Sequence, residues 1–364
     1  MKGLFLKHLK PAEHYGDIYQ DVCVDGKVVY PGWRDCDTRW NIIKPHILPN
    51  PVVMDLGSNA GYFSQKIAEE VENSLVWSME YVPGRFELQR DMLLENETPN
   101  VVLTQRKMDL FSFLKIQNSV NRVDVILALN VLEYFSPDEL FAIMGALSRI
   151  SPTLIVEFPG LEETGAAACA GTLAEIHPID TYLKQFYQYV KIIGRATAST
   201  DRSLKRDIYY CANPRIYAER LLGYITKEGI EAGGRRHTLG YEGGREKWVL
   251  NGSLDFSKGA PALNLCNLVY FGLVYPNAES LFPQIEKAYR AAAEEFGTIT
   301  DIHLRNVLYT PEGARVIDCL EHYAKAFVYG RARDGDDGFE AIFPAYLERA
   351  LTQIKTDLES GVVG

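Results

Sequence analysis

The chain has 364 residues, of which 47% are hydrophobic and 24% are charged, and its formal net charge at pH 7 is −10. The length predicts two domains, and the composition is that of a globular protein, which excludes extended disorder. The acidic balance argues against a nucleic-acid partner, because a phosphate backbone favours basic surfaces.

The six cysteines are scattered, with no CxxC pair and no metal-ligand spacing. In a chain of this size, that pattern predicts buried thiols in a reducing compartment rather than a disulfide framework. The N-terminus lacks an apolar run of signal-peptide length, and the most apolar later stretch, Leu263–Tyr275, is too short to cross a bilayer. We therefore expect a cytoplasmic protein without a membrane span.

Residues 1–50 consist of short polar and apolar pieces, and we expect them to form a cap segment. A regular alternation of strands and helices begins at Pro51. Strands are predicted at 52–57, 75–80, 100–106, 123–130 and 153–158, and helices at 62–70, 84–94 and 137–150. Strands separated by helices of this length indicate a parallel sheet with helices on both faces.

The segment 159–171 is rich in Gly and Ala, and we expect a mobile loop there. A helix at about 178–189 and strands near 190–198 and 206–212 would complete a seven-stranded α/β sheet. The pattern changes after Asn213-Pro214, so we place one domain at 51–214 and a smaller α+β domain at 215–364. The second domain includes a long predicted helix at about 280–296.

The strongest local signal is Asp55-Leu-Gly57-Ser58-Asn59-Ala-Gly61, which follows the first predicted strand and opens a helix. Ligands of open parallel sheets bind beyond the carboxyl ends of the strands. Gly57 permits a sharp turn and Gly61 permits close approach of the helix, so the backbone amides between them can face a ligand. The spacing differs from the dinucleotide fingerprint GxGxxG, whose last glycine comes later.

This turn resembles the first motif of class I S-adenosylmethionine-dependent methyltransferases, (D/E)xGxGxG, with Asn59 replacing the middle glycine. The resemblance implies a Rossmann-like seven-stranded methyltransferase sheet. It also implies that Asp55 orients the methionine part of the cofactor, Glu80 accepts the ribose hydroxyls, Asp109 meets the adenine amino group and Asn130 lines the methyl-transfer face. The cofactor-binding residues implied or considered are Arg39, Asp55, Gly57, Ser58, Asn59, Gly61, Glu80, Asp109, Leu110 and Asn130.

Arg34 and Arg39 lie in RDCDTRW, which resembles the helix that precedes the sheet in several of these enzymes. A guanidinium can grip a carboxylate with two parallel bonds, so either arginine could pair with the cofactor carboxylate. An ion-paired helix face is the alternative.

Methyl transfer from a sulfonium is an in-line displacement, for which alignment supplies much of the rate. A base is needed only when the acceptor must lose a proton. Glu133 and Tyr134, just past Asn130, are candidates to touch the acceptor, and His177 is a third candidate. The alternative for Tyr134 is packing over the cofactor or a neighbouring helix.

A second signal lies at 300–318 and resembles the catalytic and metal-binding loops of protein-kinase-like enzymes. In that group one Asp accepts the substrate proton, and an Asn and a later Asp hold magnesium. Asp301, Asn306 and Asp318 match those positions, which implies ATP and magnesium as further cofactors. The region is short for a complete kinase, and Asp318 is followed by Cys-Leu rather than Phe-Gly.

Together the two halves are similar to bifunctional methyltransferase–kinases that cap bacterial O-antigen. The leading interpretation is a methyltransferase acting on a small-molecule or glycan acceptor. The alternatives are a bifunctional methyltransferase–kinase, a non-catalytic binding protein on a methyltransferase scaffold, and a tRNA-modifying methyltransferase. The acidic charge counts against the last of these, and a homo-oligomer is left open.

Overall fold

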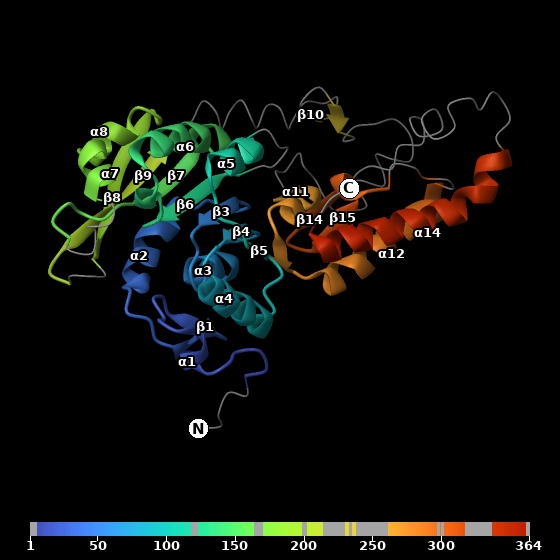
Figure 1. The fold of residues 1–364 in the computed structure, drawn as a ribbon, viewed down its shortest axis with the longest axis horizontal. Coiled ribbons are helices and arrows are strands. Elements are labelled where there is room, and N and C mark those ends of the chain that lie inside the picture. The colour runs from blue at the N-terminus through green and yellow to red at the C-terminus, as the bar shows by residue number, and fades with distance from the viewer. Residues whose placement is uncertain are drawn as a thin grey trace. The chain divides into compact units, whose positions relative to one another are not determined.

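A computed structural model of the chain describes residues 6–117, 123–163, 170–198, 202–213, 230–232, 235–237, 261–296, 299, 302–316 and 337–361. The chain forms two compact units, Met1–Glu219 and Arg220–Gly364 (Figure 1).

The first unit is built on seven strands in the order β5-β4-β3-β6-β7-β9-β8. Their bounds are β3 Val52–Leu56, β4 Leu75–Met79, β5 Val101–Thr104, β6 Val125–Leu129, β7 Thr153–Glu157, β8 Tyr189–Thr197 and β9 Lys205–Ala212. Strands β3 to β7 are mutually parallel, whereas β9 is antiparallel to both β7 and β8. The predicted seven-stranded α/β sheet is confirmed. Strand β9 is antiparallel to its neighbours because the short connection between Thr197 of β8 and Lys205 of β9 can form a hairpin. It is too short for the crossover that parallel strands need.

Helices cover both faces of this sheet, with α2, α3 and α4 on one side and α5 and α6 on the other (Figure 1). Their bounds are α2 Cys36–Ile43, α3 Tyr62–Glu70, α4 Pro83–Asn96, α5 Leu110–Gln117, α6 Pro137–Ile150, α7 Ala170–Ile176 and α8 Ile179–Leu183. Helix α6 begins with a capping box between Ser136 and Glu139 and has Pro137 in its first turn, which are strong signals for a helix start.

Three helices differ from the sequence prediction. Helix α5 is absent from that prediction. Helix α8 ends at Leu183, short of the predicted 189. Helix α7 begins at Ala170, within the segment 159–171 for which the composition predicts a mobile loop. Residues 164–169 of that segment lie outside the described part of the chain.

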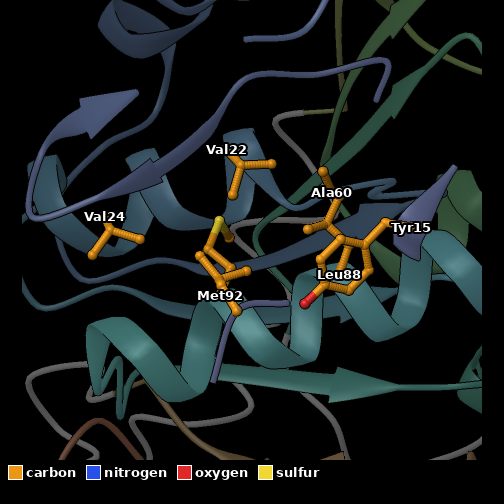
Figure 2. Packing of buried hydrophobic residues seen from close by; sticks show 7 residues of the cluster. Tyr15, Val22, Val24, Ala60, Leu88 and Met92 are labelled. Atoms are coloured by element: carbon orange, nitrogen blue, oxygen red, sulfur yellow. The ribbon is translucent and has the colours of Figure 1, made fainter. Parts of the chain in front are cut away.

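The N-terminal segment packs on α4. It contains α1 Ala12–Tyr15 and the antiparallel pair β1 Val22–Val24 and β2 Lys27–Tyr30. Figure 2 shows Tyr15 and Val22 of this segment beside Leu88 and Met92 of α4 and beside Ala60. Because Ala60 belongs to the glycine turn, the segment covers the turn and α4 with one apolar cluster.

The second unit has a small antiparallel sheet in the order β12-β14-β15. This sheet is consistent with the α+β character predicted from the sequence. The strands are β12 Leu263–Asn264, β14 Val307–Thr310 and β15 Gly313–Val316, and a separate pair is β10 Ile230–Ala232 with β11 Arg235–His237. The other elements are α11 Leu265–Tyr270, β13 Leu273–Tyr275, α12 Ala278–Phe296, the 3-10 turn Leu304–Asn306 and α14 Asp337–Ser360. Of the helices described, none is both long and apolar enough to cross a membrane.

Candidate functional site

Polar side chains collect where the parallel strands of the first unit end. Asp55 lies in β3, Glu80 and Asn130 directly follow β4 and β6, and Glu157 is the last residue of β7. These strands are parallel and adjacent, so their carboxyl ends meet at one edge of the sheet. That edge is where open α/β sheets bind ligands.

The turn after β3 depends on left-handed backbone conformations. Gly57 has φ 63°, Asn59 has φ 58° and Gly61 has φ 83°. A Cβ at Gly57 would stand 2.8 Å from Val131 Cγ2, so glycine is required there for both conformation and space. Asn tolerates the left-handed region better than most residues because its side chain bonds locally, and here Asn59 Oδ1 accepts from the amide of Ala60 at 2.8 Å.

Glu80 connects the ends of the first two strands. Its Oε2 accepts from the Asn59 amide at 2.8 Å, and its Oε1 accepts from the amides of Tyr81 and Val82 at 2.8 and 2.7 Å. The residue is 5% exposed. A carboxylate oxygen has two acceptor positions, so Oε2 retains one after its bond with Asn59, which leaves Glu80 able to accept a ligand hydroxyl.

Asp55 is a buried carboxyl group whose ionisation is disfavoured. Burial raises its pKa to about 7, although a bond from Ser64 Oγ to Asp55 Oδ2, at 2.6 Å, acts in the opposite direction. The carboxyl group therefore changes charge near neutral pH, and a nearby cation would favour its ionised form.

Asp109 begins a helix in this structure. Its Oδ1 accepts from the amide and the hydroxyl of Ser112, at 2.8 and 2.7 Å, which is the N-cap arrangement for α5. These bonds lower the pKa of Asp109. Leu110 is the first residue of α5, so both residues lie beyond β5 at the edge that holds Asp55 and Glu80.

The segment after β6 presents one buried and one exposed candidate. Glu133 is 2% exposed and Tyr134 is 74% exposed. Burial raises the pKa of Glu133 to about 8. Within the described residues, Glu133 Oε2 and Asn130 Oδ1 are buried without a hydrogen-bond partner, and buried polar atoms of this kind are uncommon unless a ligand or water meets them.

Three arginines surround Glu157 at the end of β7. Arg39 makes a two-pronged pair with it, Nε to Oε2 at 2.8 Å and Nη2 to Oε1 at 2.6 Å, and Arg34 Nη2 lies 3.2 Å from Oε2. Arg206 lies 3.5 Å from Glu157 and pairs with Glu163 as well. Burial alone would raise the pKa of Glu157, but the attraction of Arg34 and the bonds from Arg39 outweigh it, and the net pKa is lowered.

Arg39 does not fit the expected role of binding a cofactor carboxylate. Its side chain is fully buried, and beyond Glu157 it donates to the carbonyl oxygens of Asp35 and Thr197 at 2.7 and 2.9 Å. Its charge and most of its donors are used inside the protein. The Nε of Arg34, in contrast, is buried without a hydrogen-bond partner among the described residues.

The remaining predicted residues lie elsewhere in the chain. His177 is exposed and links α7 to α8, and its contact with an acceptor stays a prediction. Asn306 ends the 3-10 turn that precedes the β14–β15 hairpin, in the second unit. Asp301 and Asp318 lie outside the described residues, and among the residues that are described no group of three His, Cys, Asp or Glu side chains is arranged to hold a metal ion.

Sequence reasoning missed several residues of this edge. The sequence does contain a signal for Glu157, because this carboxylate stands near the end of a predicted strand, as Glu80 does. No sequence signal points to Gln89, Ser78 or Arg206. They belong to α4, β4 and β9, and only the folded structure brings these elements together.

No protein-family model and no curated protein sequence matches this chain. Its strand order and mixed, mostly parallel sheet are typical of Rossmann-like methyltransferases. Among solved structures, the chain is similar to the bifunctional kinase-methyltransferase WbdD at 14% identity and TM-score 0.44, over 93% of each chain.

Two further solved structures align with a smaller part of this chain. The N-terminal domain of EvdMO1, studied in the presence of SAH and D-fucose, is 14% identical over 55% of this chain and 93% of its own, with TM-score 0.38. A SAM-dependent methyltransferase from Aquifex aeolicus is 14% identical over 50% of this chain and 91% of its own, with TM-score 0.37.

Proposed function

We propose that the first unit binds S-adenosylmethionine at the carboxyl ends of its strands and transfers the methyl group to a small-molecule or glycan acceptor. One observation carries this proposal. Two buried carboxyl groups, those of Asp55 and Glu80, flank the left-handed turn after β3, and Glu80 accepts a hydrogen bond from the Asn59 amide within that turn. One carboxyl group suits a cationic amino-acid moiety, and the other suits a ribose.

The residues at this edge fit the cofactor. Glu80 Oε2 keeps an acceptor position, Asn130 Oδ1 is a buried acceptor without a partner among the described residues, and the turn lacks side chains at Gly57 and Gly61. The residues proposed to hold the cofactor are Asp55, Gly57, Ser58, Asn59, Gly61, Glu80, Asp109, Leu110 and Asn130. Arg34 replaces Arg39 as the candidate for its carboxylate, because its Nε is not used within the described residues.

When bound, the cofactor would supply a methyl group on a sulfonium sulfur: the acceptor nucleophile attacks the methyl carbon in line, and the sulfur leaves as a neutral thioether. Glu133 is the proposed proton acceptor for an acceptor hydroxyl. Its pKa of about 8, raised by burial, lies near neutral pH, which is where a general base is most effective. Arg206 and Arg34 attract its ionised form, and Tyr134 is exposed and can contact the acceptor.

Calorimetry with S-adenosylmethionine tests the proposal. We expect micromolar binding by the native chain, and loss of binding in Asp55→Ala and Glu80→Ala variants that remain folded. Absence of binding by the native chain would overturn the proposal. Mass spectrometry of extracts with and without the gene would then identify the acceptor, and Glu133→Gln should lower its methylation by about 10²–10⁴-fold if Glu133 is the base.

A second activity, phosphate transfer from ATP, is favoured by one observation in the second unit. Asn306 stands directly before an antiparallel hairpin, β14–β15, and the magnesium-binding Asn of kinase-like enzymes precedes such a hairpin in the resemblance described above. Magnesium-dependent ATP binding that is lost in Asn306→Ala and Asp318→Ala would support this activity. No ATP binding by the native chain would exclude it.

A further inference from the structure

A continuous chain of hydrogen bonds runs beneath the glycine turn, from Ser58 to Asp55. Ser58 Oγ lies 2.7 Å from Gln89 Oε1, Gln89 Nε2 lies 2.6 Å from Ser78 Oγ, Ser78 Oγ lies 2.9 Å from Ser64 Oγ, and Ser64 Oγ lies 2.6 Å from Asp55 Oδ2. All five side chains are buried. The chain joins the first residue after Gly57 to the carboxyl group at the end of β3.

The number of protons available for these hydrogen bonds fixes the direction in which they point. Each hydroxyl has a single proton, and the proton of Ser64 goes to the Asp55 carboxylate, since bonds to an ionised acceptor are the stronger ones. Because the single Ser64 proton is used on Asp55, the hydroxyl of Ser78, which accepts from the Gln89 amide group, supplies the proton for its 2.9 Å contact with Ser64. Ser58 donates to the amide oxygen of Gln89. Every proton thus points toward Asp55, an arrangement that favours the ionised carboxylate.

Gln89 is held in place from both sides. A Cβ at Gly61 would stand 2.5 Å from Gln89 Nε2, so the amide lies directly against the turn. Leu88 and Met92 of the same helix pack beneath the N-terminal segment (Figure 2). The amide therefore cannot move away from the turn without disturbing a buried cluster.

We propose that Gln89 is a positioning residue for cofactor binding: through Ser58 on one side and through Ser78 and Ser64 on the other, it fixes the glycine turn and the Asp55 carboxylate as one unit. This inference rests on the proposed function. Gln89 is fully buried, so in this proposal it acts only through the residues proposed to contact the cofactor.

The test compares cofactor binding by calorimetry in Gln89→Met, Gln89→Glu and a control, Gln65→Met. Gln65 is a glutamine of the adjacent helix α3, also buried, whose side chain bonds Glu69 and Thr98 rather than the turn. We expect Gln89→Met to weaken binding about tenfold, the equivalent of one hydrogen bond of about 1.4 kcal/mol. Gln65→Met should leave the affinity within about twofold of native, and thermal unfolding of all variants reports on folding.

The pH dependence of Gln89→Glu separates positioning from a merely structural role. A protonated Glu has one donor and one acceptor and so reproduces the amide, whereas an ionised Glu only accepts. Compared with the native chain at the same pH, the variant should bind with near-native affinity at pH 6 and with progressively lower relative affinity toward pH 8.5, as the introduced carboxyl group ionises. Asp55 ionises over this range in both proteins, so the ratio of the two affinities at each pH reports on the introduced Glu.

The outcomes distinguish the two proposals. No binding by the native chain overturns the proposed function itself. Native binding with unchanged affinity in both Gln89 variants at every pH overturns only the positioning role. If Gln89→Met does not fold, the ratio of the Gln89→Glu and native affinities decides the question: a ratio that falls from pH 6 to pH 8.5 supports the positioning role, and a constant ratio overturns it.

Discussion

The Asn59 backbone amide donates to Glu80 Oε2 at 2.8 Å, so the turn after β3 and the end of β4 are held together by one buried carboxylate. The same carboxylate accepts from the amides of Tyr81 and Val82. Glu80 thus organises the backbone of the candidate site in addition to its proposed contact with the ribose.

Replacing Glu80 should destabilise the protein as well as weaken cofactor binding. Glu80→Ala leaves three backbone amides without their acceptor, and we expect the free energy of unfolding to fall by about 1–3 kcal/mol. Urea unfolding measures this change. Glu95→Ala is the matched control, because Glu95 also accepts backbone amides, from Lys7 and His8, but at a partly exposed position. An equal loss in both variants would contradict the role of burial.

Gly57→Ala should be more damaging than Gly26→Ala. Both glycines have positive φ, 63° and 69°, so both variants bear the conformational penalty of about 1–2 kcal/mol. Only at Gly57 would the new Cβ meet another atom, Val131 Cγ2, at 2.8 Å. Thermal unfolding of each variant measures the difference, and Gly57→Ala combined with Val131→Ala should recover part of it. No recovery would show that the clash is not the cause.

Arg39 should be required for folding stability. Arg39→Ala leaves Glu157 buried with fewer partners, and breaking such a pair costs about 3–5 kcal/mol. Arg195→Ala removes an arginine whose side chain is 66% exposed and which pairs with Asp207, where a loss below about 1 kcal/mol is expected. Chemical denaturation of the two variants compares them directly. A small effect of Arg39→Ala would argue against a structural role.

The stability of the protein should fall as pH rises from 5 to 8. Burial raises the pKa of Asp55 to about 7 and that of Glu133 to about 8. Because these values exceed the unfolded ones, the native state holds protons that the unfolded state has released. The resulting penalty is absent below about pH 4, grows as pH rises through the two folded pKa values, and is complete above about pH 9.

The Asp55→Asn variant measures how much of this pH dependence of stability comes from Asp55. The variant cannot ionise at this position, so its free energy of unfolding should decline less between pH 5 and pH 8 than that of the native chain. Glu157 and Asp109 have lowered pKa values, so their ionisation changes the stability only below about pH 4.5. They therefore do not contribute to the change between pH 5 and pH 8. Parallel slopes of the native chain and the Asp55→Asn variant in urea titrations would show that the pKa of Asp55 is not raised.

Much of the first unit follows from the sequence alone. The strands around Asp55, Glu80 and Asn130 and the helix at Tyr62–Glu70 are predictable, because buried parallel strands are continuous apolar runs and the turns between them need glycine or asparagine. The seven-stranded sheet and the strand-end positions of three candidate residues depend only on this local pattern. Residues 301 and 318 stay predictions, since they lie outside the described part of the chain.

The tertiary structure alone decided which partner each side chain meets. Arg39 and Glu157 are 118 residues apart, and nothing in the sequence near either one indicates that they form a buried pair. Gln89 likewise reaches Ser58 and Ser78 only because α4 packs against the turn. The pKa values of Asp55 and Glu133 arise from burial, which depends on the whole assembled sheet. Sequence determines the ends of the strands, whereas contacts between distant segments determine the charge and the hydrogen bonds found there.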